Sequence, residues 1–119
     1  MPITTEFALH FAEGWIAAWN AHDLDRILSH YSDDFEMSSP LIVHLMDEPS
    51  GTLKGKTVIR AYWSKVLARL PDLHFDLEEV LVGVSSVVIL YRGPRGSSAE
   101  VFWFDGENKV FRAAAHYAG

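Results

Sequence analysis

The hydrophobic pattern of this chain changes at Pro71 from helical to strand-like spacing. Just before Pro71, apolar residues recur at three- and four-residue intervals and predict a helix over 57–70: Ile59, Tyr62, Trp63, Val66, Leu67 and Leu70. After Pro71, four apolar stretches are separated by turns of four to six residues. Turns this short cannot hold a crossover helix, so neighbouring strands are expected to run antiparallel. Helices followed by a sheet predict an α+β fold.

Two more helices are expected in the first part of the chain. The first, over 5–19, carries an apolar stripe that includes Trp15 and Trp19. Asp23 is the expected N-cap of a short second helix, whose apolar face includes Tyr31. Inward helical stripes mostly pack against a sheet, so the simplest role for these aromatic residues is the core. Lining a pocket is the alternative.

The strand predictions leave one segment open. Residues 32–34 are read as a turn and 35–39 as a short strand, which Pro40 ends. The later strands are expected over 74–82, 87–92, 99–104 and 110–117. Residues 40–54 hold an apolar run between breakers, and either an extra strand or a lid over a pocket mouth fits that pattern.

Size, charge and cysteine content exclude several classes of protein. A chain of 119 residues is expected to form one domain, 1–119. Its net charge of −6 argues against nucleic-acid binding. There is no cysteine, hence no disulfide or thiol chemistry, and no apolar run is long enough for a membrane span. The first residues lack the layout of a signal peptide, so a soluble, cytoplasmic protein is expected.

Neither a metal nor a nucleotide cofactor is expected. The six histidines include no pair at i, i+2 or i, i+4 spacing, the usual pattern of a local metal site. Residues 50–57 resemble a phosphate-binding loop, but the first glycine of that motif is replaced by Ser50, and no parallel sheet is expected around it. A turn before a helix explains the segment. His44 is kept as a candidate because a lid over residues 40–54 would face the ligand.

Glu100 is the most informative acidic residue. Side chains repeat every two residues along a strand, so Glu100 shares its face with Phe102 and Phe104. If that face is concave, desolvation raises the pKa of this carboxyl and fits it for proton transfer. The alternative is a solvated position at the strand edge, or an ion pair with Arg92 or Arg112.

The opposite face of the same strand carries Val101 and Trp103. A tryptophan on a sheet face that no helix covers makes an exposed apolar patch, which is typical of a subunit interface. A homodimer through the outer sheet face is therefore expected.

The order of elements and four stretches of sequence resemble a known family. The stretches are 14–25 (GWIAAWNAHDLD), 31–35 (YSDDF), 55–60 (GKTVIR) and 104–110 (FDGENKV). They are similar to SnoaL-like polyketide cyclases and ketosteroid-isomerase-like members of the nuclear-transport-factor-2-like superfamily. The resemblance implies a curved, mostly antiparallel sheet wrapped on three helices, in a cone-shaped, cystatin-like domain with an internal apolar pocket.

The resemblance also implies positions for the reacting groups. Steroid isomerases of this superfamily use a tyrosine, an aspartate base and a second acid, and the matching positions here are Trp15, Ser39 and Glu100. Only Glu100 keeps its chemistry. Two functions follow as expectations. One is a lyase or isomerase in which Glu100 moves a proton next to a carbonyl. The other is a non-catalytic carrier of an apolar small molecule. Substrate contacts are expected from Trp15, Trp19, Tyr31, Ser39, His44, Tyr62, Trp63, Phe102 and Phe104.

Overall fold

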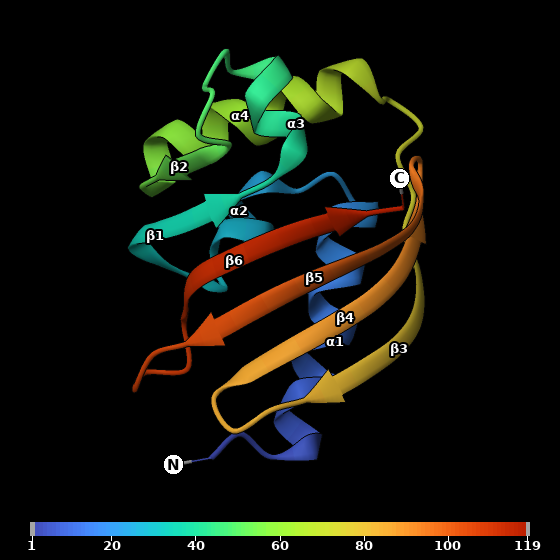
Figure 1. The fold of residues 1–119 in the computed structure, drawn as a ribbon. Helices are drawn as coiled ribbons and strands as arrows, with labels where there is room; N and C mark the ends of the chain where they lie inside the picture. Colours follow the sequence, from blue (N-terminus) through green and yellow to red (C-terminus); the bar gives the residue numbers. More distant parts are fainter. Residues whose placement is uncertain (1, 119) are drawn as a thin grey trace.

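A single curved sheet of six strands forms one layer of the computed structural model, and helix α1 lies across its inner face (Figure 1). The structure describes residues 2–118. The helices are α1 (Thr5–Asn20), α2 (Leu24–Leu28), α3 (Pro40–Leu45) and α4 (Lys56–Arg69). The strands are β1 (Tyr31–Ser38), β2 (Thr52–Lys54), β3 (Asp76–Val82), β4 (Ser86–Gly93), β5 (Gly96–Phe104) and β6 (Val110–Tyr117).

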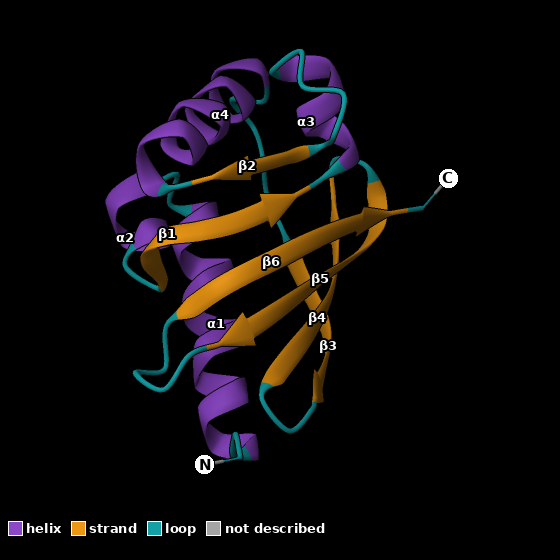
Figure 2. Cartoon of the chain, turned by 60° about the vertical axis from the view of Figure 1, so that its left-hand side comes forward, coloured by secondary structure: helices purple, strands orange, loops and turns teal. Residues whose placement is uncertain are grey.

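The sheet has the order β2-β1-β6-β5-β4-β3. Strands β3 to β6 form an antiparallel meander, as the short turns predict. Strand β1 joins this meander by pairing parallel with β6, and β2 pairs antiparallel with β1 at the edge. Figure 2 shows α4 and α3 beyond this edge, with α1 behind the sheet, so the helices close one side of it. The predicted α+β class and the mostly antiparallel sheet are confirmed.

Local sequence explains where the main helices begin and end. The Thr4 hydroxyl caps α1 by accepting a hydrogen bond from the backbone N–H of Phe7 at 3.0 Å. After Asn20 the chain turns away, with His22 at a φ of 55°. Helix α4 follows Gly55, whose φ of 95° lies in the region that favours glycine, and it ends before Pro71. Both helices lie within one residue of their predicted bounds.

Three local predictions are corrected by the structure. Residues 32–34 belong to β1 rather than to a turn, and their register with β6 shifts between Tyr31 and Glu36. Strand β2 pairs only with 36–38, so this part of β1 is an open edge where exposed acidic residues are tolerated. Tyr31 accordingly begins β1 instead of ending α2.

The third point concerns residues 40–54, for which an extra strand and a lid over a pocket mouth were the two alternatives. They form the short helix α3, which neither alternative predicted, and then the extra three-residue strand β2. Ser39 caps α3 through a hydrogen bond from the N–H of Leu41 at 3.2 Å, and Pro40 occupies the first helical position, where its missing N–H does no harm. The phosphate-loop-like residues 50–57 become β2 and the start of α4, in an antiparallel setting.

The core is an aromatic cluster between α1 and the sheet. The Trp15 ring lies 5.2 Å from Phe102, 5.4 Å from Tyr91 and 5.6 Å from Phe75, measured between ring centroids. Edge-to-face and stacked contacts of this kind add to the gain from burial alone. No helix in residues 2–118 combines the length and the apolar character needed to cross a bilayer.

Candidate active site

A cavity opens where the turn between β4 and β5 meets the end of α4 and the loop that leads to β3. Figure 1 shows these three segments at one end of the sheet. The cavity measures about 550 Å³ when the open space at its mouth is included. Its walls are mainly aromatic, with contributions from Trp15, Trp19, Tyr62, Trp63, Phe75, Tyr91 and Tyr117. A cavity with a mainly apolar lining and a few polar groups is typical of small-molecule sites.

Glu100 lies in the wall of this cavity and is 4% exposed. It points inward because β5 alternates, with Ser98 and Phe102 buried on the same face. Its direct neighbours across the sheet are Ile89 on β4 and Ala115 on β6, neither of which offers a polar side chain. Desolvation therefore raises the pKa of Glu100 to about 8. Near neutral pH most of this carboxyl is protonated.

Tyr91 holds the carboxyl in place. Its hydroxyl donates a hydrogen bond to Glu100 Oε1 at 3.3 Å, which opposes part of the rise in the pKa of Glu100. The Tyr91 ring is itself fixed by Phe75, at 4.6 Å between centroids. Within residues 2–118 no other side chain donates a hydrogen bond to Glu100. The second carboxyl oxygen is therefore available to a ligand.

All four tyrosines of the chain gather around Glu100. Besides Tyr91 they are Tyr31 on β1, Tyr62 on α4 and Tyr117 on β6. Burial is the first cause that raises the pKa of each hydroxyl, and the charge of Glu100 adds to each rise. For Tyr62 the pKa reaches about 12. These hydroxyls stay protonated at physiological pH, so they act as hydrogen-bond donors and not as bases.

Ser39 lies behind the wall and fixes one of these tyrosines. The Tyr62 hydroxyl donates to Ser39 Oγ at 3.3 Å. Ser39 also opposes the rise in the pKa of Tyr117. A serine that caps α3 and accepts from Tyr62 sets the position of that phenol.

The structure divides the predicted site residues into three groups. Trp15, Trp19, Tyr62, Trp63 and Glu100 line the cavity. Tyr31 and Ser39 are buried behind the cavity lining, and each accepts a hydrogen bond from a residue that lines it. Trp15 Nε1 donates to Tyr31 Oη at 3.0 Å, and the Tyr62 hydroxyl donates to Ser39 Oγ.

The third group lies away from the cavity lining. Phe102 and Phe104 share the face of Glu100, but they pack into the core against Phe11, at 4.9 Å between centroids in both cases. His44 is exposed on α3. The alternative ion pairs of Glu100 are absent from the described residues, because Arg92 donates to Ser97 and Arg112 lies over Trp103.

Sequence reasoning missed Tyr91, Tyr117 and Arg95, all of which line the cavity. The inward orientation of Tyr91 could have been predicted, because every second residue of β4 (Val87, Ile89 and Tyr91) lies on the same buried face. Tyr117 lies at the end of β6, and Arg95 lies in a turn whose residues resemble any other turn. Only the curvature of the sheet brings these two to the cavity.

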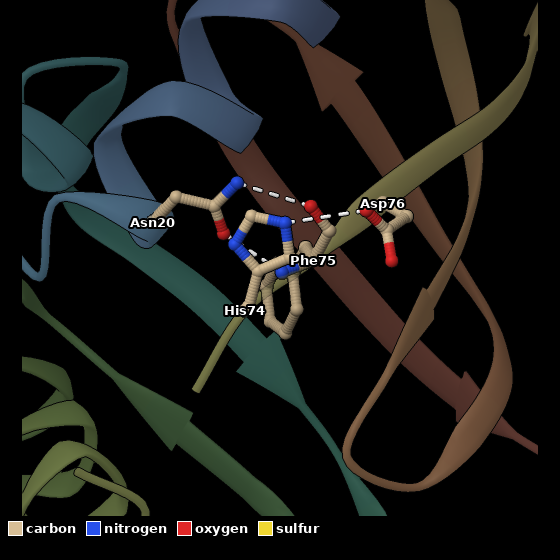
Figure 3. Close-up of polar contacts among 4 residues, drawn as sticks. All are labelled: Asn20, His74, Phe75 and Asp76. Carbon is tan, nitrogen blue, oxygen red and sulfur yellow. Dashed lines mark hydrogen bonds and ion pairs between the residues drawn. The ribbon is translucent and has the colours of Figure 1, made fainter. Parts of the chain in front are cut away.

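The loop that carries Phe75 is fastened to the end of α1 (Figure 3). The Asn20 side chain donates from Nδ2 to the carbonyl oxygen of Phe75 at 3.0 Å and accepts from its N–H at 2.7 Å. His22 contacts the carbonyl oxygen of Leu73 at 2.9 Å through Nε2. The neighbouring His74–Asp76 contact, 3.2 Å long, is exposed. The Asn20 contacts hold the Phe75 wall in place against Trp15.

Comparisons with known proteins identify the family. A family model described as a SnoaL-like domain matches residues 12–118. A SnoaL-like protein of unknown function from Burkholderia thailandensis is 56% identical, with 100% of both chains covered and a TM-score of 0.96. A search of curated proteins found no match.

Two more distant solved structures share the fold. A proposed isomerase of the SnoaL-like family from Agrobacterium tumefaciens is 18% identical, with 94% of this chain and 97% of that one covered and a TM-score of 0.74. An epoxide hydrolase/cyclase-like enzyme, described for its role in pyran ring formation in the polyether salinomycin, is 12% identical, with 95% and 92% covered and a TM-score of 0.76. The resemblance to SnoaL-like proteins seen in the sequence is confirmed: the chain belongs to the SnoaL-like family.

Proposed function

We propose that this protein is a lyase or isomerase that moves a proton next to a carbonyl group of a small, mainly apolar substrate, with Glu100 as the group that carries the proton. The observation that supports this most is the setting of Glu100. It is the one carboxyl among the residues that line the cavity, it is buried, and its pKa is raised to about 8. A perturbed acid in an apolar cavity is a common mark of a catalytic site.

The proposed step uses both forms of the carboxyl. Ionised Glu100 takes a proton from the carbon next to the carbonyl, and the electron pair of that C–H bond moves toward the carbonyl oxygen to form an enolate. The protonated carboxyl then returns the proton to another carbon, which completes an isomerisation. In the lyase case the electron pair of the enolate re-forms the carbonyl and expels a leaving group from the adjacent carbon, and the protonated carboxyl gives its proton to that group. A carboxylate with a pKa near 8 is a stronger base than an ordinary one and still ionises within a practical pH range.

Tyr117 supplies a hydrogen bond that such an enolate needs. It lines the cavity, and its hydroxyl remains protonated because burial raises its pKa, whereas the Tyr62 hydroxyl already donates to Ser39. A preorganised donor in a site that excludes water stabilises developing charge on oxygen. The Trp15 N–H is already bonded to Tyr31, so the tryptophan serves as an apolar wall.

The deciding experiment is turnover by Glu100→Gln. Glutamine keeps the shape of the side chain and cannot take up a proton from carbon, so we expect at least a hundredfold loss of kcat with little change in KM. In the native protein kcat should rise with pH through an inflection near 8. Glu79→Gln, on the exposed surface of β3, is the matched control. Unchanged turnover by Glu100→Gln would rule out the proposed role.

A carrier of an apolar small molecule is the second candidate, and one observation favours it. Ser39, at the position where steroid isomerases have their aspartate base, caps α3 and accepts from Tyr62, and a serine alone cannot serve as that base. A carrier would show saturable binding that raises the melting temperature, with the ligand recovered unchanged after long incubation. Chemical conversion of the bound ligand would show that the protein is an enzyme and not a carrier.

A further inference from the structure

Only two of the described side chains in the cavity lining carry a carboxyl group or a permanent charge, and these two lie at different depths. Glu100 is buried, whereas Arg95 is exposed at the turn between β4 and β5. The remaining described lining residues are aromatic, aliphatic or hydroxylic, besides Gly93 and Pro94. Glu100 is largely neutral near pH 7 because burial raises its pKa to about 8, so the charge of the cavity there is the positive charge of Arg95.

Arg95 is directed toward the cavity and its hydroxyl groups. The central carbon of its guanidinium group lies 5.2 Å from the centroid of the Tyr117 ring, which is a cation–π contact. Its charge also lowers the pKa of Tyr62 and Tyr117 against the effect of burial. Among residues 2–118 no carboxylate lies within 4.0 Å of it.

A second arginine on the same hairpin provides a contrast. Arg92 is also exposed, but it donates to Ser97 Oγ at 3.3 Å and is absent from the cavity lining. Arg92 has a polar partner, Ser97, on the surface, whereas Arg95 contacts the ring of Tyr117 at the mouth of the cavity. Within residues 2–118 no group accepts a hydrogen bond from Arg95, and its planar guanidinium fork matches a carboxylate or another planar anion.

We propose that the ligand of this cavity is an amphipathic acid, with a small apolar body inside and one carboxylate or similar planar anionic group paired with Arg95 at the mouth. This rests on the proposed function, because it names the substrate class of the same site. It also sets the orientation: the end of the molecule that carries the anion stays at Arg95, and the opposite end reaches Glu100. A carboxylate placed beside Glu100 instead would be desolvated without a cationic partner.

The size of the cavity limits the apolar body. The cavity measures about 550 Å³ with the open space at its mouth included, which is within the range of sites for small ligands, so the apolar body is small. Single-ring acids are therefore the appropriate probes.

The test compares acids with their amides. Benzoate, phenylacetate and 3-phenylpropionate, each with its primary amide, are titrated into the native protein, Arg95→Met and the matched control Arg92→Met at low salt and pH 6.5. At least one acid should bind the native protein about tenfold more tightly than its amide. Arg95→Met should abolish that preference with the amide affinity unchanged, and Arg92→Met should retain it. Arg95→Lys, which keeps the charge but not the fork, should give an intermediate preference.

Different failures have different meanings. If acid and amide bind the native protein equally, or if Arg95→Met keeps the preference, the acidic ligand is wrong while the apolar cavity and the role of Glu100 stand. If no acid or amide binds the native protein, a one-ring ligand class is wrong, and the acidic-ligand proposal fails with it. Loss of turnover in Glu100→Gln is read separately and tests the reaction alone.

Discussion

The hydroxyl of Tyr91 donates to Glu100 Oε1 across 3.3 Å, from one strand to the next. This hydrogen bond favours the ionised carboxyl, whereas burial disfavours it, and burial has the larger effect on the pKa of Glu100. The result is an acid that is held in one orientation and still titrates near pH 8. Four predictions follow from this arrangement and from the elements that support it.

The stability of the fold should fall as pH rises toward 8. In the unfolded chain Glu100 ionises near its usual pKa of 4.5, and in the folded chain near 8. Between these values the unfolded state has lost a proton that the folded state retains, so unfolding becomes easier as pH increases. The contribution is complete below pH 4.5 and is lost by pH 8, on the order of 5 kcal/mol in total. The tyrosines around Glu100 titrate above this window.

Denaturant unfolding of the native protein and of Glu100→Gln between pH 4 and 9 measures this contribution. The difference in the free energy of unfolding between the two proteins should change in favour of the variant as pH rises, and level off above pH 8. The same series with Glu79→Gln should run parallel to the native protein. A difference that does not vary with pH would mean that the pKa of Glu100 is not raised in the folded protein.

Replacing Tyr91 with phenylalanine should move this pH window upward. The hydroxyl lowers the pKa of Glu100, so its removal raises that pKa further and leaves a buried carboxyl without its donor. We expect a destabilisation of about 1–3 kcal/mol and a later inflection in the pH–stability curve. Tyr117→Phe, which removes a phenol not bonded to Glu100, should leave the inflection closer to its native position. Identical inflections in native protein and Tyr91→Phe would contradict the hydrogen bond.

Asn20→Ala should loosen the cavity wall. The variant leaves both the N–H and the carbonyl of Phe75 without their side-chain partner (Figure 3). The expected destabilisation is about 1–3 kcal/mol, together with weaker binding of any cavity ligand. His74→Ala breaks only the exposed contact with Asp76 and should change stability by less than about 1 kcal/mol. Equal melting temperatures for the two variants would show that the Asn20 contacts do not hold the loop.

We propose that two copies pair through the outer face of the sheet. Four half-buried apolar residues of β4 and β5 lie on the face away from α1: Val88, Leu90, Val101 and Trp103. A dimer should be seen by sedimentation at micromolar concentration, and Trp103→Glu should convert it to a monomer. Leu9→Glu changes an exposed apolar residue on α1 and should leave the dimer intact. A native protein that sediments as a monomer would contradict this proposal.

The sequence predicted the elements well where one periodicity dominates. The stripe around Trp15 and the run from Ile59 to Leu70 each gave a helix, and the alternation in 99–104 placed Glu100 on the same face as Phe102 and Phe104. Residues 32–34 were misread because polar residues at an open strand edge look like a turn. The secondary structure of residues 40–54 could not be predicted from the sequence, because a six-residue helix offers too few positions to show a period.

The site was harder to predict than the fold, for a physical reason. Glu100 could be singled out because it shares a strand face with Phe102 and Phe104, although the sequence left open which face turns inward. Tyr117 and Arg95 come to the cavity only through the curvature of the sheet and the position of a turn, neither of which can be read from the local spacing of residues. His44 failed to reach the cavity lining because the segment that carries it coils into α3 and turns this side chain outward.

The parallel pairing of β1 with β6 also governs when the cavity can form. Lys109 reaches the carbonyl oxygen of Ser29 across a sequence separation of 80 residues, and the β6 strand that follows docks beside β1. Closing so long a loop is a slow, late event in folding compared with forming the local hairpins. Tyr117 joins the cavity wall only after that event. During synthesis we therefore expect the meander β3–β5 to pair early, and the cavity to be completed only once the β6 residues have left the ribosome.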